Sequence, residues 1–497
     1  MRKRIAIIGS GFSGLSAAAY AAKEGHEVHV FEKNSTPGGR ARQFKTDNGY
    51  TFDMGPSWYW MPDVINAFFN DFGYEATDFY KLVRLDPQFE MIFANGRLDI
   101  PSGYQELKAV CEAVEHGAGE KFEAFMRAAR YKYEVGMRQF VQKPCHSWWE
   151  FVTPQIAASA LRLDLLSNFR SYVKSYFKHL WLTALMEFPV IFLGASPKKI
   201  PALYSLMNYG GYVLGTWYPM GGFYELVLAM QRIAESEGAS FHFNQSVEEI
   251  CTNKGKVTGL IVKGEELEFD AVIASSDYHH TEKLLDAANR NYTEDYWESR
   301  TFAPSSLIYY LGFNEPIPHL KHHTLFFEHD LDGHIDDIYT DKQWPRQPLF
   351  YACCPSKTDT SVAPAGHENL FLLMPLATGL EDNEMMREQY FREMIARIEK
   401  ATGTTDLISK IDYKRSYCVK DFIDDYNAYK GNAYGLANTL AQTAVLKPAL
   451  RNKKLSNLFY TGQLTVPGPG VPPSLISGKI AATAVNNLKS FRFEKSF

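Results

Sequence analysis

The first 32 residues constrain the fold more than any other part of the chain. A short apolar run over 4–8 is followed by the pattern G-x-G-x-x-G over 9–14. Small apolar residues then recur at helical spacing, and a second apolar run over 28–31 ends at Glu32. A strand, a glycine-rich turn, a helix and a second strand, with an acid roughly 20 positions past the glycines, are typical of a dinucleotide-binding unit. The sequence therefore predicts an α/β protein built on a parallel sheet.

Each residue type in this unit has a chemical role. Gly9 permits the tight turn, Gly11 lets the backbone approach a pyrophosphate, and Gly14 lets helix and strand pack closely. The start of the helix offers free N–H groups and partial positive charge to phosphates. Glu32 can accept hydrogen bonds from ribose hydroxyls. A glycine-rich turn in an unrelated α/β protein is the alternative. The predicted nucleotide contacts from this unit are Gly9, Gly11, Phe12, Ser13, Gly14, Glu32 and Lys33.

The segment after the acid favours FAD over NAD. Gly38-Gly39-Arg40 combines two glycines, which allow a close backbone approach, with an arginine that offers a donor fork to phosphate. Residues 52–57 then read F-D-M-G-P-S. The predicted contacts from this segment are Gly38, Gly39, Arg40, Gly55, Pro56 and Ser57.

The C-terminal region carries a second unit of the same kind. An apolar run over 458–460 precedes Gly462 and Gln463, and two prolines after Val471 suit the first turn of a helix. This strand, glycine turn and helix start make a second site for an anion or a dipole. A plain terminal helix with a proline-rich entry is the alternative.

The glycine-rich unit, the acid, the G-G-R element and the F-D-x-G segment, in this order, resemble flavoproteins of the amine oxidase and carotenoid desaturase type. The resemblance implies a Rossmann-like domain that binds FAD non-covalently, an inserted mixed-sheet substrate domain and a helical membrane-associated lid. It also implies flavin contacts at Gly462, Gln463 and Val471 and an adenine contact at the Val247 amide. The expected FAD-binding domain comprises 1–75, 216–280 and 441–497; the substrate domain comprises 76–135 and 281–440, and the lid 136–215.

The runs G-G-R-A-R, F-D-M-G-P-S and P-G-P-G-V-P more closely resemble bacterial carotenoid desaturases of the phytoene desaturase type. This implies a phytoene desaturase that introduces double bonds into a C40 polyene by hydride transfer to flavin, with a quinone or oxygen as the electron acceptor. A downstream enzyme, such as a hydroxycarotenoid 3,4-desaturase, is an alternative. An aromatic content of 14% suits an apolar substrate site as well as an ordinary core. The sequence assigns no catalytic residue.

The region 151–215 is aromatic, amphipathic and basic, which suits either contact with an anionic membrane surface or an ordinary helical cap. No run approaches the roughly 20 apolar residues of a membrane span. We therefore expect a cytoplasmic enzyme that is peripherally associated with the inner membrane. A net charge of −5 disfavours nucleic acid as a partner.

Two other functions share the expected fold. A flavin amine or amino-acid oxidase would need a polar substrate site, and the covalent flavin cysteine of that group is not recognisable because 419–497 contains no cysteine. An escort protein of the prenylated-GTPase type would bind no flavin, which the intact glycines, acid and arginine disfavour. Five histidines cluster between 319 and 334 without recognisable metal-ligand spacing. They are predicted to lie on the surface or in loops, and no metal site is predicted.

Overall fold

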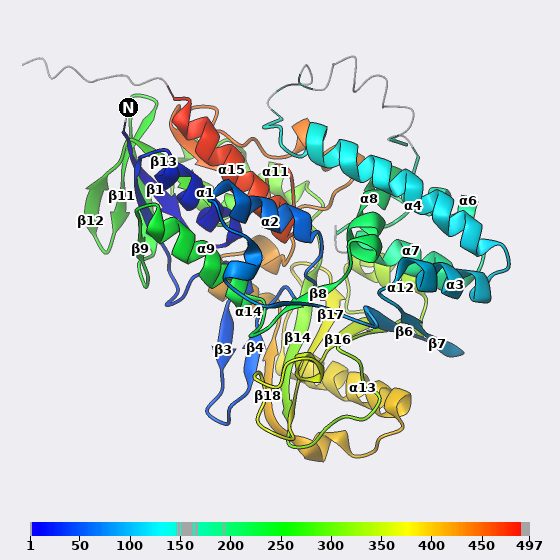
Figure 1. Ribbon diagram of the computed structural model, residues 1–497. Helices are drawn as coiled ribbons and strands as arrows, with labels where there is room; N and C mark the ends of the chain where they lie inside the picture. The colour runs from blue at the N-terminus through cyan, green and yellow to red at the C-terminus, as the bar shows by residue number, and fades with distance from the viewer. Residues whose placement is uncertain are drawn as a thin grey trace, which may run out of the picture.

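The computed structural model describes residues 2–145, 147, 150, 163–164, 167–191 and 194–488. Two large sheets organise these residues, one of five strands and one of seven (Figure 1). The chain crosses between the two parts repeatedly, so each part is assembled from segments that are far apart in the sequence. The domain boundaries given above stay a prediction.

The five-stranded sheet is parallel throughout and contains the predicted N-terminal unit. Its order is β19-β13-β1-β2-β9. The strands are β1 (Arg4–Ile8), β2 (Glu27–Phe31), β9 (Ala239–His242), β13 (Ala271–Ala274) and β19 (Leu458–Tyr460). The strand β13 lies next to β1 and β9 lies next to β2, and both come from the middle of the chain. Every residue of β13 and β19 is buried, as parallel strands covered on both faces require.

Three helices cover one face of this sheet. The helix α1 (Phe12–Lys23) packs between α9 (Tyr224–Ser236) and α15 (Val471–Asn486), as Figure 1 shows. On the other face lies an antiparallel sheet of β10 (Val247–Asn253), β11 (Lys256–Val262) and β12 (Glu265–Glu268). The two ends of the described chain thus meet at α1 and α15, which confirms the prediction that the N-terminal and C-terminal units come together.

The seven-stranded sheet is mixed, with only β15 and β6 pairing in parallel. Its order is β18-β14-β17-β16-β15-β6-β7. The strands are β18 (Ile411–Tyr417), β14 (Ser305–Phe313), β17 (Glu368–Leu376), β16 (Phe350–Cys353), β15 (His323–Phe326), β6 (Phe89–Phe93) and β7 (Gly96–Ile100).

Side chains alternate between the two faces of the sheet along each strand. Both faces are covered by other parts of the chain. On β14, Leu307, Tyr309 and Leu311 pack toward α13 (Glu384–Thr402). Ile308 and Tyr310 face the opposite way, into the largest hydrophobic cluster of the described chain. That second face carries the helices α3 (Tyr104–Val114), α4 (Ala118–Val135), α6 (Phe169–Tyr176), α7 (Leu180–Ile191) and α8 (Leu206–Asn208).

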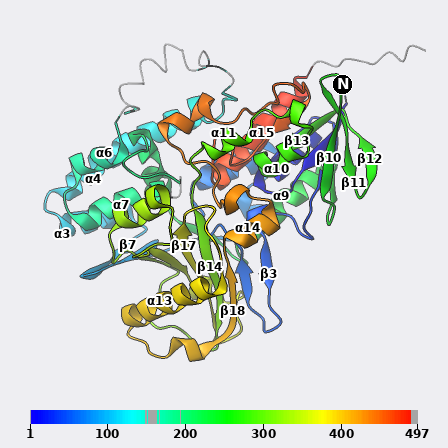
Figure 2. The ribbon, with the colours of Figure 1, turned by 180° about the vertical axis from the view of Figure 1, so that it is seen from behind.

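The remaining elements connect the two sheets. The helix α14 (Val419–Tyr426) lies between them in both views (Figures 1 and 2). The other elements are α2 (Pro62–Asp71), α10 (Tyr278–Lys283), α11 (Glu294–Glu298), α12 (Leu331–Asp336), β3 (Gln43–Lys45), β4 (Thr51–Asp53), β5 (Leu82–Arg84) and β8 (Trp217–Pro219).

The region expected to form a lid is largely helical where it is described, and most of its apolar side chains are buried, although Leu180 is 80% exposed. Phe169, Val173 and Phe177 are fully buried in the large cluster. Trp181 stacks on Phe93 of β6 with ring centroids 5.0 Å apart. The stretch 151–162 lies outside the described residues, and membrane contact by this region stays a prediction.

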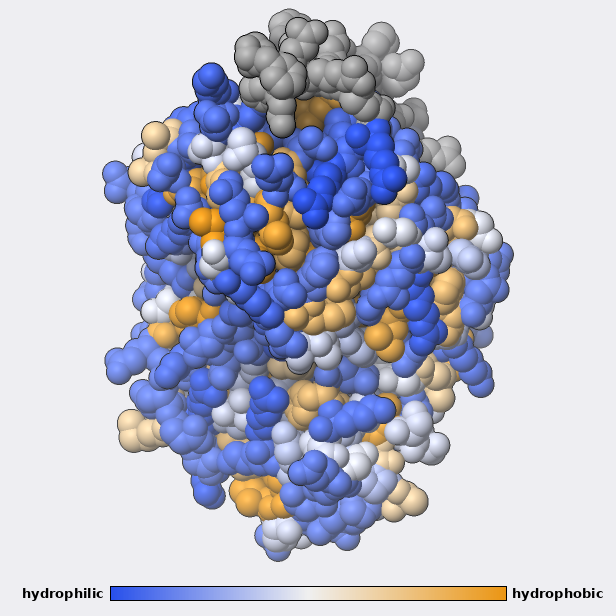
Figure 3. Space-filling model, turned by 90° about the vertical axis from the view of Figure 1, so that its left-hand side faces the viewer, coloured by the Kyte–Doolittle hydropathy of each residue, from blue (hydrophilic) through white to orange (hydrophobic). Residues whose placement is uncertain are grey.

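The described helices include none that is long and apolar enough to cross a membrane. The face seen in Figure 3 is hydrophilic over most of its area, with hydrophobic side chains in small separate groups.

The prediction that the clustered histidines lie on the surface or in loops is wrong for three of them. His322, His323 and His334 are 6%, 0% and 3% exposed. The cause is tertiary: β15 lies inside the seven-stranded sheet, between β16 and β6, and both faces of that sheet are covered. The residues around these histidines in the sequence do not indicate that they are buried.

Candidate flavin and substrate site

One cavity of about 810 Å³ extends from the carboxyl end of the five-stranded sheet toward the seven-stranded sheet. Every site residue predicted from the sequence lines it except Gly14. The cavity therefore brings together residues from the start, the middle and the end of the chain.

The glycine turn leaves space where a phosphate would lie. Gly9 adopts a φ of +94°, which favours glycine. A Cβ atom added at Gly11 would meet no protein atom within 4 Å and would point into the cavity, while one at Gly14 would overlap the Gly9 carbonyl oxygen. Gly14 is thus a packing residue between the helix and the turn, and Gly11 is the position of close approach.

Glu32 is held at the end of β2 by the chain itself. Its two carboxylate oxygens accept hydrogen bonds from the Ser10 backbone N–H at 2.9 Å and from the Asn34 N–H at 2.9 Å. The side chains of Ser10 and Asn34 add further hydrogen bonds at 2.7 and 3.0 Å. The side chain is 4% exposed and borders the cavity. These four hydrogen bonds occupy about as many acceptor sites as a carboxylate has, so a ribose hydroxyl would replace a side-chain donor such as Ser10 Oγ.

The G-G-R element pairs directly with the glycine turn. The Gly38 N–H donates to the Ser10 carbonyl at 2.8 Å, and Gly38 adopts a φ of +110°. The segment containing Gly55 crosses over this element so closely that a Cβ atom there would lie 2.5 Å from the Arg40 carbonyl oxygen. Three predicted motifs therefore form one wall of the cavity.

Asp53 anchors the F-D-x-G segment to the start of α9. Its carboxylate accepts from the Phe223 N–H at 2.6 Å and from the Gln43 side-chain amide at 3.0 Å. Burial raises the pKa of Asp53 to about 6. The acid of this motif thus positions backbone and does not face the cavity lumen.

Arg40 is a half-buried cation that forms no ion pair with the described residues, although the Asp277 charge acts on it from a distance. Its Nη2 donates to the Asn432 carbonyl at 3.0 Å, and its guanidinium lies 5.2 Å from the centre of the Tyr426 ring. Its Nε has no hydrogen-bond partner among the described residues, and it forms no ion pair with them. Burial lowers the pKa of the Arg40 guanidinium. A half-buried cation with an unused donor at a cavity wall is matched by an anionic group of a ligand.

The C-terminal unit closes the cavity opposite the glycine turn. Gly462, with a φ of +107°, donates its N–H to Ser477 Oγ at 3.0 Å, and Val471 begins α15. Ser16 Oγ of α1 donates to the Leu475 carbonyl at 2.6 Å, which holds the two helices together. The N-termini of α1 and α15 consequently open onto the same space.

Three further predicted residues line the same cavity. Val247 begins β10. The Lys33 ammonium group donates to the Asp424 carbonyl at 2.7 Å, so it ties β2 to α14 and is not free for a phosphate. The Gln463 side chain hydrogen-bonds Asn432 at 3.0 Å, next to Arg40.

Sequence reasoning missed two groups of polar residues in the wall. Ser275 and Asp277 follow β13, and Ser275 Oγ lies 2.7 Å from Ser13 Oγ. Because β13 is parallel to β1 and next to it, polar residues at its carboxyl end were a usable signal. Asp425 and Asn427, at the end of α14, had no such signal.

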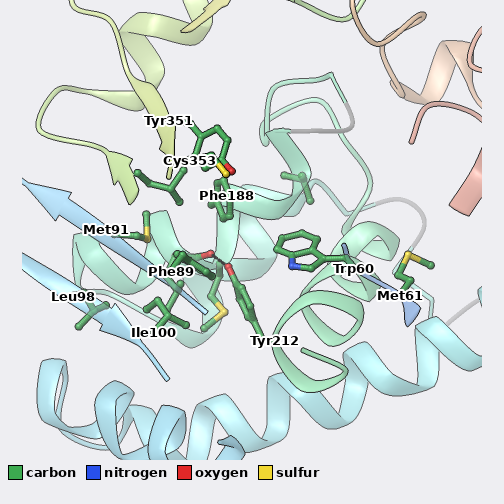
Figure 4. Close-up of a cluster of buried hydrophobic side chains, with 14 of the residues drawn as sticks. Trp60, Met61, Phe89, Met91, Leu98, Ile100, Phe188, Tyr212, Tyr351 and Cys353 are labelled. Atoms are coloured by element: carbon green, nitrogen blue, oxygen red, sulfur yellow. Dashed lines mark hydrogen bonds between the residues drawn. The ribbon is translucent and has the colours of Figure 1, made fainter. Parts of the chain in front are cut away.

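Away from the nucleotide residues the cavity wall is apolar and aromatic. Trp58, Trp60 and Met61 contribute to it, and Tyr351 lies across from them on β16. Figure 4 shows Trp60, Met61 and Tyr351 around the apolar cluster that backs this wall. The apolar lining includes Met54, Trp58, Met207, Phe223, Ile308 and Leu373.

Charged residues of the described wall lie mostly with the nucleotide motifs. They are Glu32, Lys33, Arg40, Lys143, Asp277 and Asp425. Asp425 is paired with Arg42 at 2.6 Å, and the Lys143 ammonium group donates to the Glu150 carbonyl. The apolar half therefore offers no free charge to a substrate, and the polar half fits a dinucleotide with phosphates and ribose hydroxyls.

The family model described as flavin containing amine oxidoreductase matches residues 12–486 of this chain. The carotenoid 3,4-desaturase of Haloarcula japonica is 41% identical over 484 residues, which cover 97% of each protein. The zeta-carotene-forming phytoene desaturase of Myxococcus xanthus is 32% identical over 490 residues, covering 96% of this chain and 93% of that protein.

Solved structures with the same fold include a putative protoporphyrinogen oxidase from an Exiguobacterium species, at a TM-score of 0.61 and 13% identity. The alignment covers 98% of this chain and 100% of that one. An oxidoreductase from Methanosarcina mazei gives a TM-score of 0.60 at 17% identity, covering 95% and 98% of the two chains. The predicted α/β flavoprotein fold is confirmed.

Proposed function

Because this chain belongs to the flavin-containing amine oxidoreductase family and, within it, to the carotenoid desaturases, we propose that it introduces the 3,4 double bond into an acyclic C40 carotenoid. It is an oxidoreductase that acts on CH–CH groups, and its cofactor is FAD. We take the position of the new double bond from the name of the 41% identical relative.

The observation that carries the substrate class is the composition of the cavity wall. A hydrocarbon chain has no polar handle, so its affinity must come from apolar and aromatic contact. The half lined by Trp58, Met207 and Leu373 supplies such contact. An amino-acid substrate would need a free guanidinium in that half for its carboxylate, and the described wall offers none there. This supports a desaturase over an amino-acid oxidase.

The residues of the site have separable tasks in this proposal. When bound, FAD supplies the hydride acceptor for a C–H bond of the substrate. Arg40 and the N-termini of α1 and α15 bind the pyrophosphate, Glu32 binds ribose, and Gly11 leaves room for both. The aromatic wall holds the polyene in one orientation and excludes water from the reacting carbons. We propose non-covalent binding of FAD, with a quinone or oxygen as the electron acceptor.

A phytoene desaturase is the second candidate, favoured by the 32% identical relative and by the same apolar wall. The two candidates differ in which substrate is consumed. We would express the chain in cells that accumulate only phytoene and, separately, in cells that accumulate a later acyclic carotenoid whose 3,4 bond is saturated.

We expect loss of two hydrogen atoms and a red-shifted absorption spectrum only in the second strain, measured by chromatography with mass detection. Consumption of phytoene would contradict the 3,4 assignment and support the second candidate. No change in either strain, with flavin bound, would contradict both. An Arg40→Met variant serves as the negative control in each strain.

We also propose that the substrate enters from a membrane surface beside residues 440–446. Leu440 and Leu446 are 50% and 43% exposed, and Leu440 lies in the cavity wall. Exposed leucines at the edge of an apolar cavity suit shallow insertion into a bilayer. This location differs from the predicted lid, where Phe169, Val173 and Phe177 are buried and Leu180 is an exposed exception.

A Leu440→Glu/Leu446→Glu double variant is expected to bind vesicles at least tenfold more weakly. The reason is that each buried leucine side chain contributes about 1.5–3 kcal/mol. Cosedimentation with anionic lipid vesicles would measure the change. Leu180→Glu is the matched control, because Leu180 is 80% exposed but does not line the cavity. Equal binding by the double variant and the control would contradict the proposed entry.

A further inference from the structure

A buried cluster of two histidines and one cysteine lies outside the roles assigned so far. Cys353 of β16 is paired directly with His323 of β15 across the antiparallel ladder, and His322 immediately precedes that strand. Their exposed fractions are 2%, 0% and 6%. One ligand atom of each residue lies within 4.8 Å of the other two. Figure 4 shows Cys353 next to Tyr351 on β16, above Phe188.

The hydrogen bonds of the two imidazoles leave the same nitrogen unused on each ring. His322 Nδ1 lies 2.7 Å from Thr358 Oγ1, and His323 Nδ1 lies 2.6 Å from the Tyr351 hydroxyl. Both Nε2 atoms are buried and have no hydrogen-bond partner among the described residues. When Nδ1 donates to a hydroxyl oxygen, Nε2 carries a lone pair that is free to bind a metal ion. This is the arrangement of metal-binding histidines, in which the second nitrogen is held by an outer partner.

His334 shows what a purely structural histidine looks like in the same region. Its Nδ1 accepts from the Leu349 N–H at 2.9 Å, and its Nε2 donates to the Pro375 carbonyl at 2.9 Å. Both nitrogens are therefore satisfied by backbone. The two Nε2 atoms of the cluster differ from those of His334 because they have no hydrogen-bond partner among the described residues. Each buried, unsatisfied nitrogen lowers the stability of the folded protein by about 1–3 kcal/mol.

We propose that His322 Nε2, His323 Nε2 and Cys353 Sγ bind one Zn²⁺ ion. A thiolate and two imidazoles are the donor set that zinc prefers. Binding forms one Zn–S and two Zn–N bonds and releases the thiol proton to solvent. A cavity of about 20 Å³ borders Cys353, though not the two histidines, and has room for one water. It is too small for a substrate, so the role proposed for the ion is structural.

Aromatic rings enclose the cluster. The His323 ring stacks on Trp58 at 4.2 Å, and the His322 ring lies edge-on to Tyr218 at 4.8 Å.

The nearest acids are held by other partners. The Asp359 carboxylate accepts from the Gly221 N–H at 2.6 Å and from Ser361, and Asp53 is held by Phe223 as described above. Neither acid is available to protonate or neutralise the cluster. The His323 ring is also linked to the cavity wall, because the Tyr351 hydroxyl that it contacts lies 2.9 Å from Ser57 Oγ.

The test is zinc content of the flavin-loaded, tag-free protein, produced with added zinc and dialysed against metal-free buffer. We expect about one zinc per chain by mass spectrometry, and loss of at least four fifths of it in Cys353→Ser and His323→Gln. Cys354→Ser is the matched control. This neighbouring thiol is equally buried but lies 3.5 Å from Ser356 Oγ and 3.6 Å from the Glu368 carboxylate. The Cys354→Ser variant should therefore keep its zinc.

A second readout covers the case in which the cluster variants fail to fold. Cobalt-substituted wild type should show a sulfur-to-cobalt charge-transfer band in the difference spectrum against the zinc form. Chelator-treated wild type should melt several degrees lower and recover with Zn²⁺ but not with Mg²⁺. Wild type with no stoichiometric zinc and no such band would overturn the proposal, as would equal zinc in Cys353→Ser and Cys354→Ser.

Discussion

A Gly11→Val variant is expected to purify folded and colourless, with less than a tenth of the wild-type flavin content. Gly11 has φ −69° and ψ 176°, an extended conformation that valine adopts without strain. Its added side chain would meet no protein atom near Cβ but would fill the space predicted for the pyrophosphate. Flavin absorbance per chain measures the loss, and thermal melting compared with apo wild type shows that the fold survives.

The neighbouring Gly14→Ala variant should behave differently. Its Cβ atom would overlap the Gly9 carbonyl, so the turn must move before any cofactor binds. We expect both the flavin content and the apo melting temperature to fall. Normal flavin loading in Gly11→Val, or an equal loss of apo stability in both variants, would contradict the assignment of Gly11 to the pyrophosphate site.

Replacing Arg40 by methionine should weaken the binding of FAD without lowering the stability of the apo protein. Most substitutions in a protein core lower stability instead. Removing one partner of a buried charge pair costs about 2–5 kcal/mol of binding, which is roughly a 30- to 4000-fold loss of FAD affinity. The apo protein, however, holds this cation half-buried and without an ion pair among the described residues. Removing it should leave apo stability unchanged or raise it. Titration of apo protein with FAD and chemical denaturation measure the two quantities.

Arg42 provides the matched control. It is also a largely buried arginine, but it pairs with Asp425 at 2.6 Å and does not line the cavity. Arg42→Met should therefore destabilise the apo protein, because it leaves a partly buried carboxylate without its partner. If Arg40→Met were the more destabilising of the two, the role of Arg40 as an anion-binding residue would be wrong.

The nucleotide half of the site was predictable because its residues are dictated by local geometry. Gly11, Gly38 and Gly462 are required by turns and close approaches that a few residues define. Glu32 follows from its distance to the glycine turn. Asn432 and Asp425 were not predictable, since they reach Arg40 and Arg42 only after the intervening sheet has folded.

The burial of the histidines, by contrast, could not be predicted from the sequence. His322 and His323 occur in a stretch with several histidines, which reads as a polar loop. Their burial depends on β15 pairing with β6, more than 200 residues earlier in the chain. Likewise, the amphipathic pattern within 151–215 predicted a helical region, and α6 lies in it, but only the packed structure shows that the apolar side of this helix faces protein. Periodicity identifies an apolar face without identifying what covers it.

The order of strands in the parallel sheet has a consequence for synthesis. The turn at Gly11 leaves the ribosome early, but β19 and the Gly462 turn that complete the flavin site come about 450 residues later. At roughly 5–20 residues per second, about 20–90 s pass in between. The strand β13 is made about 180 residues before β19, so its edge toward β19 stays open for about 9–37 s of that time. Until β19 and the Gly462 turn emerge, the nascent chain exposes a strand edge and cannot close around its cofactor.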